Sequence, residues 1–335
     1  MEKHLQLIIE NAIKAPSGHN TQPWKFKVDE DHITIRPDFT RSLPVTDPDN
    51  HELFISLGCA LENLVIAADH YGYEAFAMAH EGDDASIDVS LWPASRRKYA
   101  TLFSQINIRQ STRNEYDGRV IPPDHLAQLN ASISHEGVSC RIITEPYMIA
   151  AVTELAKEAC MRQFTNTAFV DELVHWIRFN QAKAEKTQDG LYSAAVGSPS
   201  VPDWFGKFIM GNTVSPEHEA AKCEKLIRSS SALVVFVAKQ NTLANWINVG
   251  RAFERFTLTA SALGIHNAPE NMPCQEVDVR EKLARLLQLT EGEQPLMLVR
   301  IGYSAKMPYS YRRPINEVVV ESSRTLADPR GPLAN

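Results

Sequence analysis

The sequence predicts an α+β fold made of two related halves in one chain. Segments with the helical spacing of apolar residues alternate with short strand-like segments, some of them in hairpins. The segment 58–72 aligns without gaps on the segment 250–264, and both are long, apolar and bounded by glycine. The chain has 335 residues, the length of one large domain or two ordinary ones.

The N-terminal part begins with a helix and a hairpin. Apolar residues have helical spacing over 2–14, and Pro16 stops this helix. Residues 24–28 and 32–35 alternate between apolar and polar side chains and are separated by three acidic residues, which predicts a β-hairpin. The further elements expected here are a long helix over 52–70 that ends at Gly72 and short strands near 75–78 and 87–91.

A second series of helices and strands begins after Pro122-Pro123. Asp124 can cap a helix that runs to about Ser134. The apolar run over 233–237 predicts a fully buried strand. The other elements expected are strands over 138–143 and 296–301 and helices over 148–162, 244–263 and 279–287. Together with the hairpins, these elements predict an α+β domain with a central sheet.

The region from about 164 to 214, called the lid below, differs from the rest. Glycines and prolines interrupt its helical pieces, and its pattern is less clear around 203–212. An insertion this irregular inside a compact domain is usually a functional cover or a mobile excursion.

The two aligned segments indicate an internal duplication. Five pairs are identical, namely Gly58/Gly250, Ala60/Ala252, Glu62/Glu254, Ala68/Ala260 and Gly72/Gly264. Part of this similarity is what any buried helix with a C-terminal glycine shows. A true duplication would make the chain a pseudo-dimer of a truncated half, 1–105, and a second half, 106–325, that contains the lid. Ligand sites often lie at such two-fold interfaces.

Composition narrows the classes of function. The net charge is −7, so a broad nucleic-acid surface, which needs a basic excess, is not expected. No stretch approaches the ~18 apolar residues of a membrane span, and the charged start Met1–Leu5 does not resemble a secretion signal. The five cysteines are widely spaced without a Cys-x-x-Cys pair, a usage typical of a reduced, cytoplasmic protein.

Two short segments carry residues suited to a ligand. In the arginine segment, Arg109–Arg113, alternate residues project to one side of an extended chain, so two guanidinium groups and the hydroxyl of Ser111 can converge on a phosphate. Alone, this segment fits a solvated basic turn better. In the Pro-Ser loop, Pro16–Trp24, small residues let backbone approach a planar ligand, and Ser17 and Asn20 offer donors and acceptors. Alone, this loop could equally be a polar connection.

Together these segments resemble the nitroreductase-like FMN proteins. That family has an Arg-x-Ser-x-Arg/Lys start, a helix that ends in Pro-Ser-x-x-Asn-x-Gln-Pro-Trp, and a glycine-bounded core helix late in the chain. Here Gln22-Pro23-Trp24 matches, with Pro16, Ser17 and Asn20 in step. Two other segments match: 263–271 is similar to the loop along the flavin ring, and 311–319 to the basic C-terminal phosphate contact.

The chain departs from the usual family pattern in one respect. Family members are usually homodimers with two FMN sites, each combining the arginine segment of one subunit with the Pro-Ser loop of the other. Here the first half has no arginine segment, and the second half reads Ser132–Arg141 after its helix, without Asn-x-Gln-Pro-Trp. The chain is similar to the tandem, single-chain Acg-type members, for which flavin sequestration under a lid has been proposed. One complete and one vestigial site are implied, and a monomer is possible.

The resemblance implies FMN as the cofactor. We expect the flavin N5 to carry the chemistry, taking hydride from NAD(P)H and reducing a nitro, quinone or similar acceptor. A backbone amide near Pro269–Asn271 would lie beside N5, and no catalytic side chain is required. The residues expected to bind FMN are Pro16, Ser17, Gly18, Asn20, Arg109, Gln110, Ser111, Arg113, Pro269, Glu270, Asn271, Arg312 and Arg313. The alternatives are a non-enzymatic FMN-binding protein whose lid sequesters the flavin, and a pseudo-dimer that has lost flavin.

Other patterns carry less information. Four His-Glu pairs, at 51–52, 80–81, 135–136 and 218–219, lack the second histidine of a zinc helix, so no metal site is expected. His19 and His266 lie in the proposed flavin loops, where a structural role fits as well as proton transfer. Cys223 and Leu226 stand where the family usually offers an Asn and a Lys or Arg to the flavin, which leaves normal flavin reactivity open.

Overall fold

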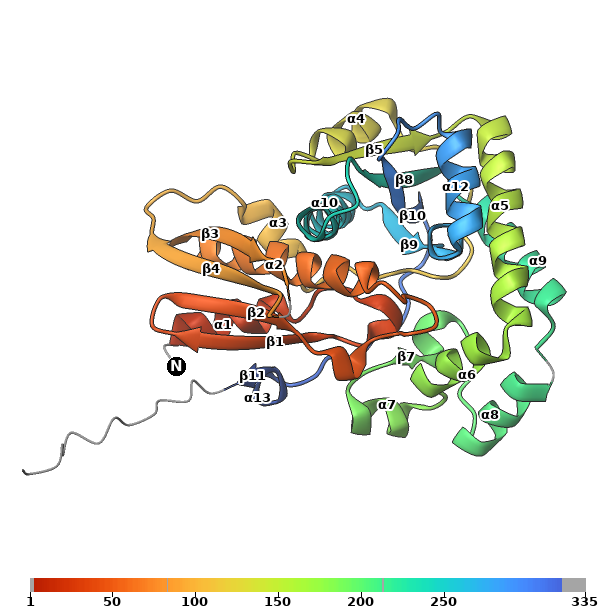
Figure 1. The fold of residues 1–335 in the computed structure, drawn as a ribbon, viewed down its shortest axis with the longest axis horizontal. Helices are drawn as coiled ribbons and strands as arrows, with labels where there is room; N and C mark the ends of the chain where they lie inside the picture. The colour runs from red at the N-terminus through yellow and green to blue at the C-terminus, as the bar shows by residue number, and fades with distance from the viewer. Residues whose placement is uncertain (1–2, 83, 213, 321–335) are drawn as a thin grey trace, which may run out of the picture.

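The chain folds around two β-sheets rather than the one central sheet expected. The structure is a computed structural model that describes residues 3–82, 84–212 and 214–320 (Figure 1). The first sheet has the order β11-β1-β2-β4-β3, and all its pairs are antiparallel except β1 with β11. Its strands are β1 (Trp24–Asp29), β2 (His32–Pro37), β3 (Tyr73–His80), β4 (Ser86–Pro93) and β11 (Val319–Val320). The predicted hairpin is confirmed as β1 and β2.

The second sheet is antiparallel and has the order β5-β8-β10-β9. Its strands are β5 (Val138–Ile143), β8 (Ala232–Ala238), β9 (His266–Pro269) and β10 (Gln294–Gly302). All seven residues of β8 are buried, as the apolar run predicted. The strand β9 was not expected, because its short sequence His-Asn-Ala-Pro has no alternation of apolar and polar residues.

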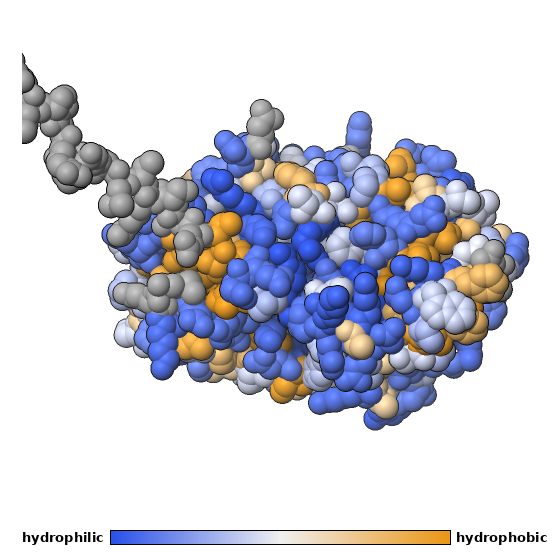
Figure 2. Space-filling view, turned by 90° about the horizontal axis from the view of Figure 1, so that it is seen from below, coloured by the Kyte–Doolittle hydropathy of each residue, from blue (hydrophilic) through white to orange (hydrophobic). Residues whose placement is uncertain are grey.

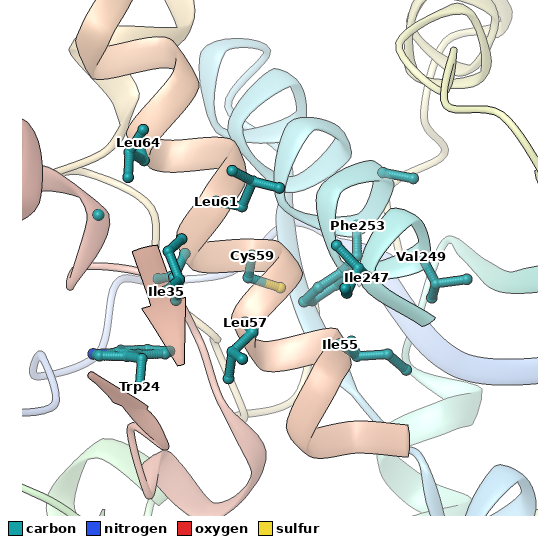
Figure 3. Close-up of a cluster of buried hydrophobic side chains, with 14 of the residues drawn as sticks. Trp24, Ile35, Ile55, Leu57, Cys59, Leu61, Leu64, Ile247, Val249 and Phe253 are labelled. Atoms are coloured by element: carbon teal, nitrogen blue, oxygen red, sulfur yellow. The ribbon is translucent and has the colours of Figure 1, made fainter. Parts of the chain in front are cut away.

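Two long helices, α2 (His51–Tyr71) and α10 (Leu243–Ala262), pack against each other between the sheets. Both were predicted within two residues at each end. Figure 3 shows α2 between two groups of buried side chains, with Trp24 and Ile35 from the first sheet on one side and Ile247 and Phe253 of α10 on the other. The helix α2 has the length and hydropathy of a membrane span, contrary to the sequence analysis, but 94% of that stretch is buried inside the protein.

The crossing of α2 and α10 is close and reciprocal. A Cβ added to Gly58 would lie 2.0 Å from the carbonyl oxygen of Ile247, and one added to Gly250 would lie 1.9 Å from that of Ile55. Each glycine therefore contacts the residue three positions before the other glycine. No larger residue fits at either position without separating the helices.

The remaining helices cover the sheets. The first is α1 (Lys3–Ala12), and α4 begins at Pro123, so Asp124 lies in its first turn and is not its cap as predicted. Helices α5 and α9 pack together and share a second apolar core with α12 and the outer side of β8. The other helices outside the lid are α3 (Ala100–Gln105), α4 (Pro123–Ala131), α5 (Pro146–Thr165), α9 (Pro216–Arg228), α11 (Met272–Gln275), α12 (Val277–Leu286) and α13 (Ile315–Val318).

The lid is more regular than its sequence indicated. Its elements are α6 (Thr167–Trp176), β6 (Ile177–Arg178), α7 (Gln181–Thr187), β7 (Leu191–Tyr192) and α8 (Asp203–Asn212). Figure 2, which looks onto the molecule from below, shows apolar side chains gathering at the end where the lid helices lie. In α8, the side chain of Trp204 is 73% exposed. The final residues of the predicted second half, 321–325, lie outside the described residues.

Candidate functional site

One cavity brings together the segments that the sequence analysis singled out. It lies beside the N-terminal part of α2 and contains about 1060 Å³ of empty space, its open mouth included. Its walls come from the Pro-Ser loop, the arginine segment, the chain after β9 and the lid. The predicted site residues that line it are Pro16, Ser17, Gly18, Ser111, Arg113, Pro269 and Asn271. A cavity of this kind suits a small molecule or cofactor.

The Pro-Ser loop is folded tightly against α2. The hydroxyl of Ser17 accepts the backbone N–H of Gln22 at 2.9 Å, and the N–H of Gly18 donates to the hydroxyl of Ser56 at 3.4 Å. His19, Asn20 and Gln22 have φ angles of 44°, 54° and 54°. Such left-handed conformations are uncommon outside glycine and cluster at binding sites. This turn exposes the residues from Pro16 to His19 to the cavity.

The arginine segment runs beside β9. Ser111 forms a parallel β-bridge with Asn267, and the backbone N–H of Thr112 donates to the carbonyl of Asn267 at 2.8 Å. In such an extended segment, residues two apart point to the same side. This explains why Ser111 and Arg113 both line the cavity, whereas Arg109, expected on the same side, does not.

Three arginines gather where this segment meets the C-terminal part of the chain. Arg109 is buried, with its Nε 3.2 Å from a carboxylate oxygen of Glu254 in α10. Arg109 and Arg312 both donate to the carbonyl of Lys14, at 3.3 and 3.2 Å. Burial, followed by the charges of Arg109 and Arg113, lowers the pKa of Arg312 to about 9, although Glu254 opposes this. Glu254 is the carboxylate that opposes the charges of Arg109 and Arg312. The carboxylate that opposes Arg113, Glu270, is already paired with Arg300. Positive charge is therefore in excess in this cluster.

This cluster contains buried donors without partners. Among the described residues, Nε and Nη1 of Arg109, Nε of Arg312 and Nδ1 of His19 form no hydrogen bond. The ion pair of Nε of Arg109 with Glu254 lacks hydrogen-bond geometry. Arg113 donates its backbone N–H to the sulfur of Met307, but its guanidinium has no partner in the described part of the chain. Buried polar groups are normally hydrogen-bonded. The set therefore fits an anion rich in acceptor oxygens, such as a phosphate monoester.

The imidazole of His19 is neutral in this environment. Burial and the charge of Arg113 lower the pKa of His19 to about 4. The residue can therefore donate or accept a hydrogen bond near the arginines, but it adds no charge at neutral pH.

Several predicted site residues use their side chains in other contacts. The amide of Gln110 binds the backbone of Met307 in both directions, at 2.9 and 2.7 Å. Asn20 donates to the carbonyls of Gly190 and Tyr311 at 3.0 and 3.1 Å. These two amides therefore attach the lid and the C-terminal segment to the Pro-Ser loop and the arginine segment.

Two more predicted residues use their charged groups in internal contacts. Glu270 accepts from Arg300 at 2.8 Å. Arg313 donates to the carbonyl of Gln22 at 3.1 Å and to that of Glu317. Six predicted residues are not among those that line the cavity, namely Asn20, Arg109, Gln110, Glu270, Arg312 and Arg313.

The cavity also contains an acid that the sequence analysis missed. Glu52, in the first turn of α2, lines the wall and is only 8% exposed. Its Oε1 accepts from Asn271 and, at 2.9 Å, from Gln275. Burial, together with the negative charge of Asp47, raises the pKa of Glu52 to about 7, while His51 opposes the shift. The sequence analysis considered the pair His51-Glu52 only as an incomplete zinc motif.

The residues next to Glu52 form an ion-pair cluster. Nδ1 of His51 lies 3.1 Å from a carboxylate oxygen of Asp47 and 2.5 Å from one of Asp49. The imidazole nitrogen and the two carboxylate oxygens lie within 4.8 Å of one another. Burial lowers the pKa of His51, but the two carboxylates raise it to about 10 overall. The imidazole is therefore protonated at neutral pH and forms ion pairs with both carboxylates. Asp47 also accepts the backbone N–H groups of Glu52 and Leu53 and so caps α2.

Comparisons with known proteins agree with the resemblance. No family model matches the chain. A Mycobacterium tuberculosis protein provisionally named as an NAD(P)H nitroreductase, Rv3131, is 25% identical, with 94% of this chain and 90% of that protein covered. The protein acg of the same organism, provisionally named in the same way, is 22% identical, with 92% and 93% covered. The Serratia protein PigM, also provisionally an NAD(P)H nitroreductase, is 27% identical over 57% of this chain and 55% of its own.

Solved structures show weaker likenesses. A Bacteroides fragilis nitroreductase with bound FMN is 16% identical, covering 64% of this chain and 93% of its own, with a TM-score of 0.37. The NADPH:FMN oxidoreductase of Vibrio harveyi complexed with NAD+ is 13% identical, covering 66% and 77%, with a TM-score of 0.41. These scores are too low to support an argument about the site. The sequence relatives match about nine-tenths of the chain, so over nearly its whole length the chain is similar to proteins provisionally named as NAD(P)H nitroreductases. Its own fold is α+β.

Proposed function

We propose that this chain binds one FMN in the cavity beside α2 and uses it to pass electrons from NAD(P)H to a nitro, quinone or similar acceptor. The observation that carries this proposal is the buried cluster of Arg109, Arg113 and Arg312 with unpartnered donors. At about 1.5–3 kcal/mol for each charged hydrogen bond, a phosphate held there gains several kcal/mol of affinity. When bound, FMN supplies the hydride chemistry through its N5.

The chain's own residues bind and shield the cofactor. Arg109, Ser111, Arg113 and Arg312 would hold the phosphate. The loops Pro16–His19 and Pro269–Asn271 would lie along the ring, with a backbone amide of the second loop beside N5. The lid contributes apolar side chains to the cavity, namely Phe164, Phe169, Leu173 and Leu191, which exclude water and strengthen the electrostatic interactions inside.

The contacts of the lid favour a second candidate function, FMN binding without turnover. Asn20 and Gln22 in the Pro-Ser loop donate to the lid carbonyls of Gly190 and Gln188, at 3.0 and 2.9 Å. Asp189 between them pairs with Arg41 and, at 2.7 Å, with Arg178. A lid held by these contacts would retain a flavin and slow the entry of substrate. This observation keeps the sequestering protein as an alternative.

The two helices support the proposed duplication into halves 1–105 and 106–325. A second cavity, of about 990 Å³, lies on the other side of the α2–α10 pair. Five of its lining residues are 192 positions away from residues that line the first cavity. These pairs are Glu52/Ala244, Ile55/Ile247, Ser56/Asn248, Cys59/Arg251 and Leu61/Phe253. Such a relation is what an internalised two-fold axis produces.

Charge explains why we propose one FMN and not two. In the second cavity, Arg251 and Arg255 replace Cys59 and Asn63, and both pair with the buried Glu62. No counterpart of the arginine segment lines that cavity. We therefore propose that the chain has one complete FMN site. We also propose that it functions as a monomer, since the interface that is usual between two subunits would lie within the single chain.

The test is to purify the chain, measure its visible spectrum and FMN content, and add NADH or NADPH without oxygen. The proposal expects about one FMN per chain and bleaching of the flavin by at least one of the two reductants. A colourless protein that takes up no FMN would overturn both functions. A yellow protein whose flavin stays oxidised with both reductants would overturn the reductase and leave the binding protein. Light scattering that gives a stable dimer would contradict the monomer.

A further inference from the structure

The acid Glu52 distinguishes the cavity proposed for FMN from its counterpart. In the aligned helices the residue 192 positions later is Ala244, which lines the second cavity. A carboxyl group buried in a cavity wall is costly unless it is hydrogen-bonded or neutral. Glu52 lines the cavity that the arginine segment also lines, and the second cavity has Ala244 in its place. This difference indicates that Glu52 has a role in the chemistry of the first cavity.

The two oxygens of Glu52 have different surroundings. Oε1 accepts hydrogen bonds from Asn271 and Gln275, so the carboxyl group is fixed in orientation. Oε2 has no hydrogen-bond partner among the described residues and lies 3.6 Å from the position that a Cβ on Gly18 would take. Gly18 and Glu52 line both this cavity and a smaller adjoining pocket that includes Leu43. Oε2 therefore lies against the Pro-Ser loop, where the two spaces adjoin.

The charges around Glu52 allow it to hold a proton near neutral pH. Burial and Asp47 raise its pKa to about 7, and His51 opposes them. Burial also keeps the Cys274 thiol on α11 protonated, since its pKa is raised. The titratable and charged groups that face Glu52 are Asp47 and Asp49 in the preceding loop, His51 on α2, Cys274 on α11, Arg280 on α12, and His19 and Arg113 on the cavity wall.

We propose that Glu52 is the proton donor for the acceptor reduced in this cavity, an inference that rests on the proposed function. For a quinone, the reduced flavin supplies a hydride, and the O–H bond at Oε2 breaks as a new O–H bond forms on the second quinone oxygen. The product is the hydroquinone, and the carboxylate left on Glu52 recovers a proton from water at the cavity mouth. Electrons come from NAD(P)H through the flavin.

The test compares the wild type with Glu52→Gln, which keeps an acceptor for Asn271 and Gln275. In the wild type, kcat/KM for a quinone should fall as pH rises through about 7. In the variant it should be about 10²- to 10⁴-fold lower at pH 6 and nearly independent of pH. Glu276→Gln is the control, because burial also raises the pKa of Glu276 but the residue does not line the cavity; it should keep the wild-type profile.

An infrared difference spectrum gives a second readout that does not depend on turnover. The wild type minus Glu52→Gln should show the C=O band of a protonated carboxylic acid, and this band should disappear as pH rises through about 7. A yellow, reducible wild type whose Glu52→Gln variant keeps the rate and pH profile would overturn the proton donor alone. So would the absence of the band at pH 5. A wild type that binds no FMN would overturn the proposed function itself.

Discussion

Removing Arg113 should separate cofactor affinity from fold stability. Its guanidinium has no partner among the described residues, and burial, with Arg300 and Arg109 adding to the effect, lowers its pKa against the opposing charge of Glu270. In Arg113→Ala no buried carboxylate loses its partner, so the apo protein should unfold at the same temperature as the wild type or higher. The phosphate loses a charged donor worth about 1.5–3 kcal/mol, so FMN should bind about 10- to 150-fold more weakly.

Arg109→Ala should behave differently, although the residue belongs to the same segment. Its partner Glu254 is fully buried, and burial raises the pKa of Glu254, which the charge of Arg109 opposes. Removing one member of a buried pair costs about 3–5 kcal/mol because the other charge is left uncompensated. The variant should therefore lose both stability and FMN. Adding Glu254→Gln should restore most of the stability but not the FMN affinity.

The assay is quenching of FMN fluorescence on binding, paired with thermal unfolding of the apo protein. Arg285→Ala is the control, since Arg285 is an exposed arginine on α12 that, among the described residues, pairs only with Glu281 on its own helix. It should match the wild type in both measurements. The reasoning is refuted if Arg113→Ala binds FMN within twofold of the wild type, because the proposed phosphate position would then be wrong.

Three further predictions test the fold. Gly58→Ala should prevent folding, since its Cβ would lie 2.0 Å from the carbonyl oxygen of Ile247; a soluble variant with wild-type circular dichroism would contradict the close crossing. The pKa of Glu52 is raised to about 7 in the folded protein, so the protonated acid stabilises the fold below pH 4.5 and this stability is lost as pH rises through 7. Glu52→Gln imitates the protonated acid at every pH. In urea, the variant should therefore unfold like the wild type at pH 4 but be up to about 3 kcal/mol more stable at pH 8.5. Arg255→Ala should destabilise the protein at pH 7 by leaving Glu62 less compensated. Burial alone raises the pKa of Glu62, but its cationic partners lower it to about 2. The stability that the charged Glu62 gives the wild type should therefore be lost as pH falls below about 4.5. Equal urea midpoints for Arg255→Ala and wild type at pH 7 would refute the pairing.

Much of the local structure follows from short-range patterns. The strand 138–143 was predicted with its observed limits, and the hairpin of β1 and β2 within two residues, because alternation of apolar and polar side chains extends to the strand ends. The long helices were similarly clear, since α2 ends at Gly72, which has a φ of 103°. Separation into two sheets could not be read from these patterns, because pairing partners lie far apart along the chain.

The cavity residues were predicted less evenly, and the reason is physical. Ser17, Gly18, Ser111 and Arg113 reach the cavity because the backbone around them sets their direction. Asn20 and Gln110 have equally suitable side chains, but backbone groups of the lid and of the C-terminal segment occupy them. Such partners carry no sequence signal. Glu52 was missed for the related reason that its chemistry depends on burial and on Asp47, and not on a motif.

The aligned glutamates Glu62 and Glu254 show how the proposed duplication could become asymmetric without losing the fold. Both are fully buried at the centre of the helix pair, and a buried carboxylate requires a cation nearby. Glu254 forms an ion pair with Arg109 of the arginine segment. Glu62 forms ion pairs with Arg251 and Arg255, which lie on α10. On the proposed duplication, these two arginines, together with His135, compensate Glu62 in the absence of a second arginine segment. They lie where the second cavity would otherwise resemble the first, so the change that neutralises Glu62 also removes the second flavin site.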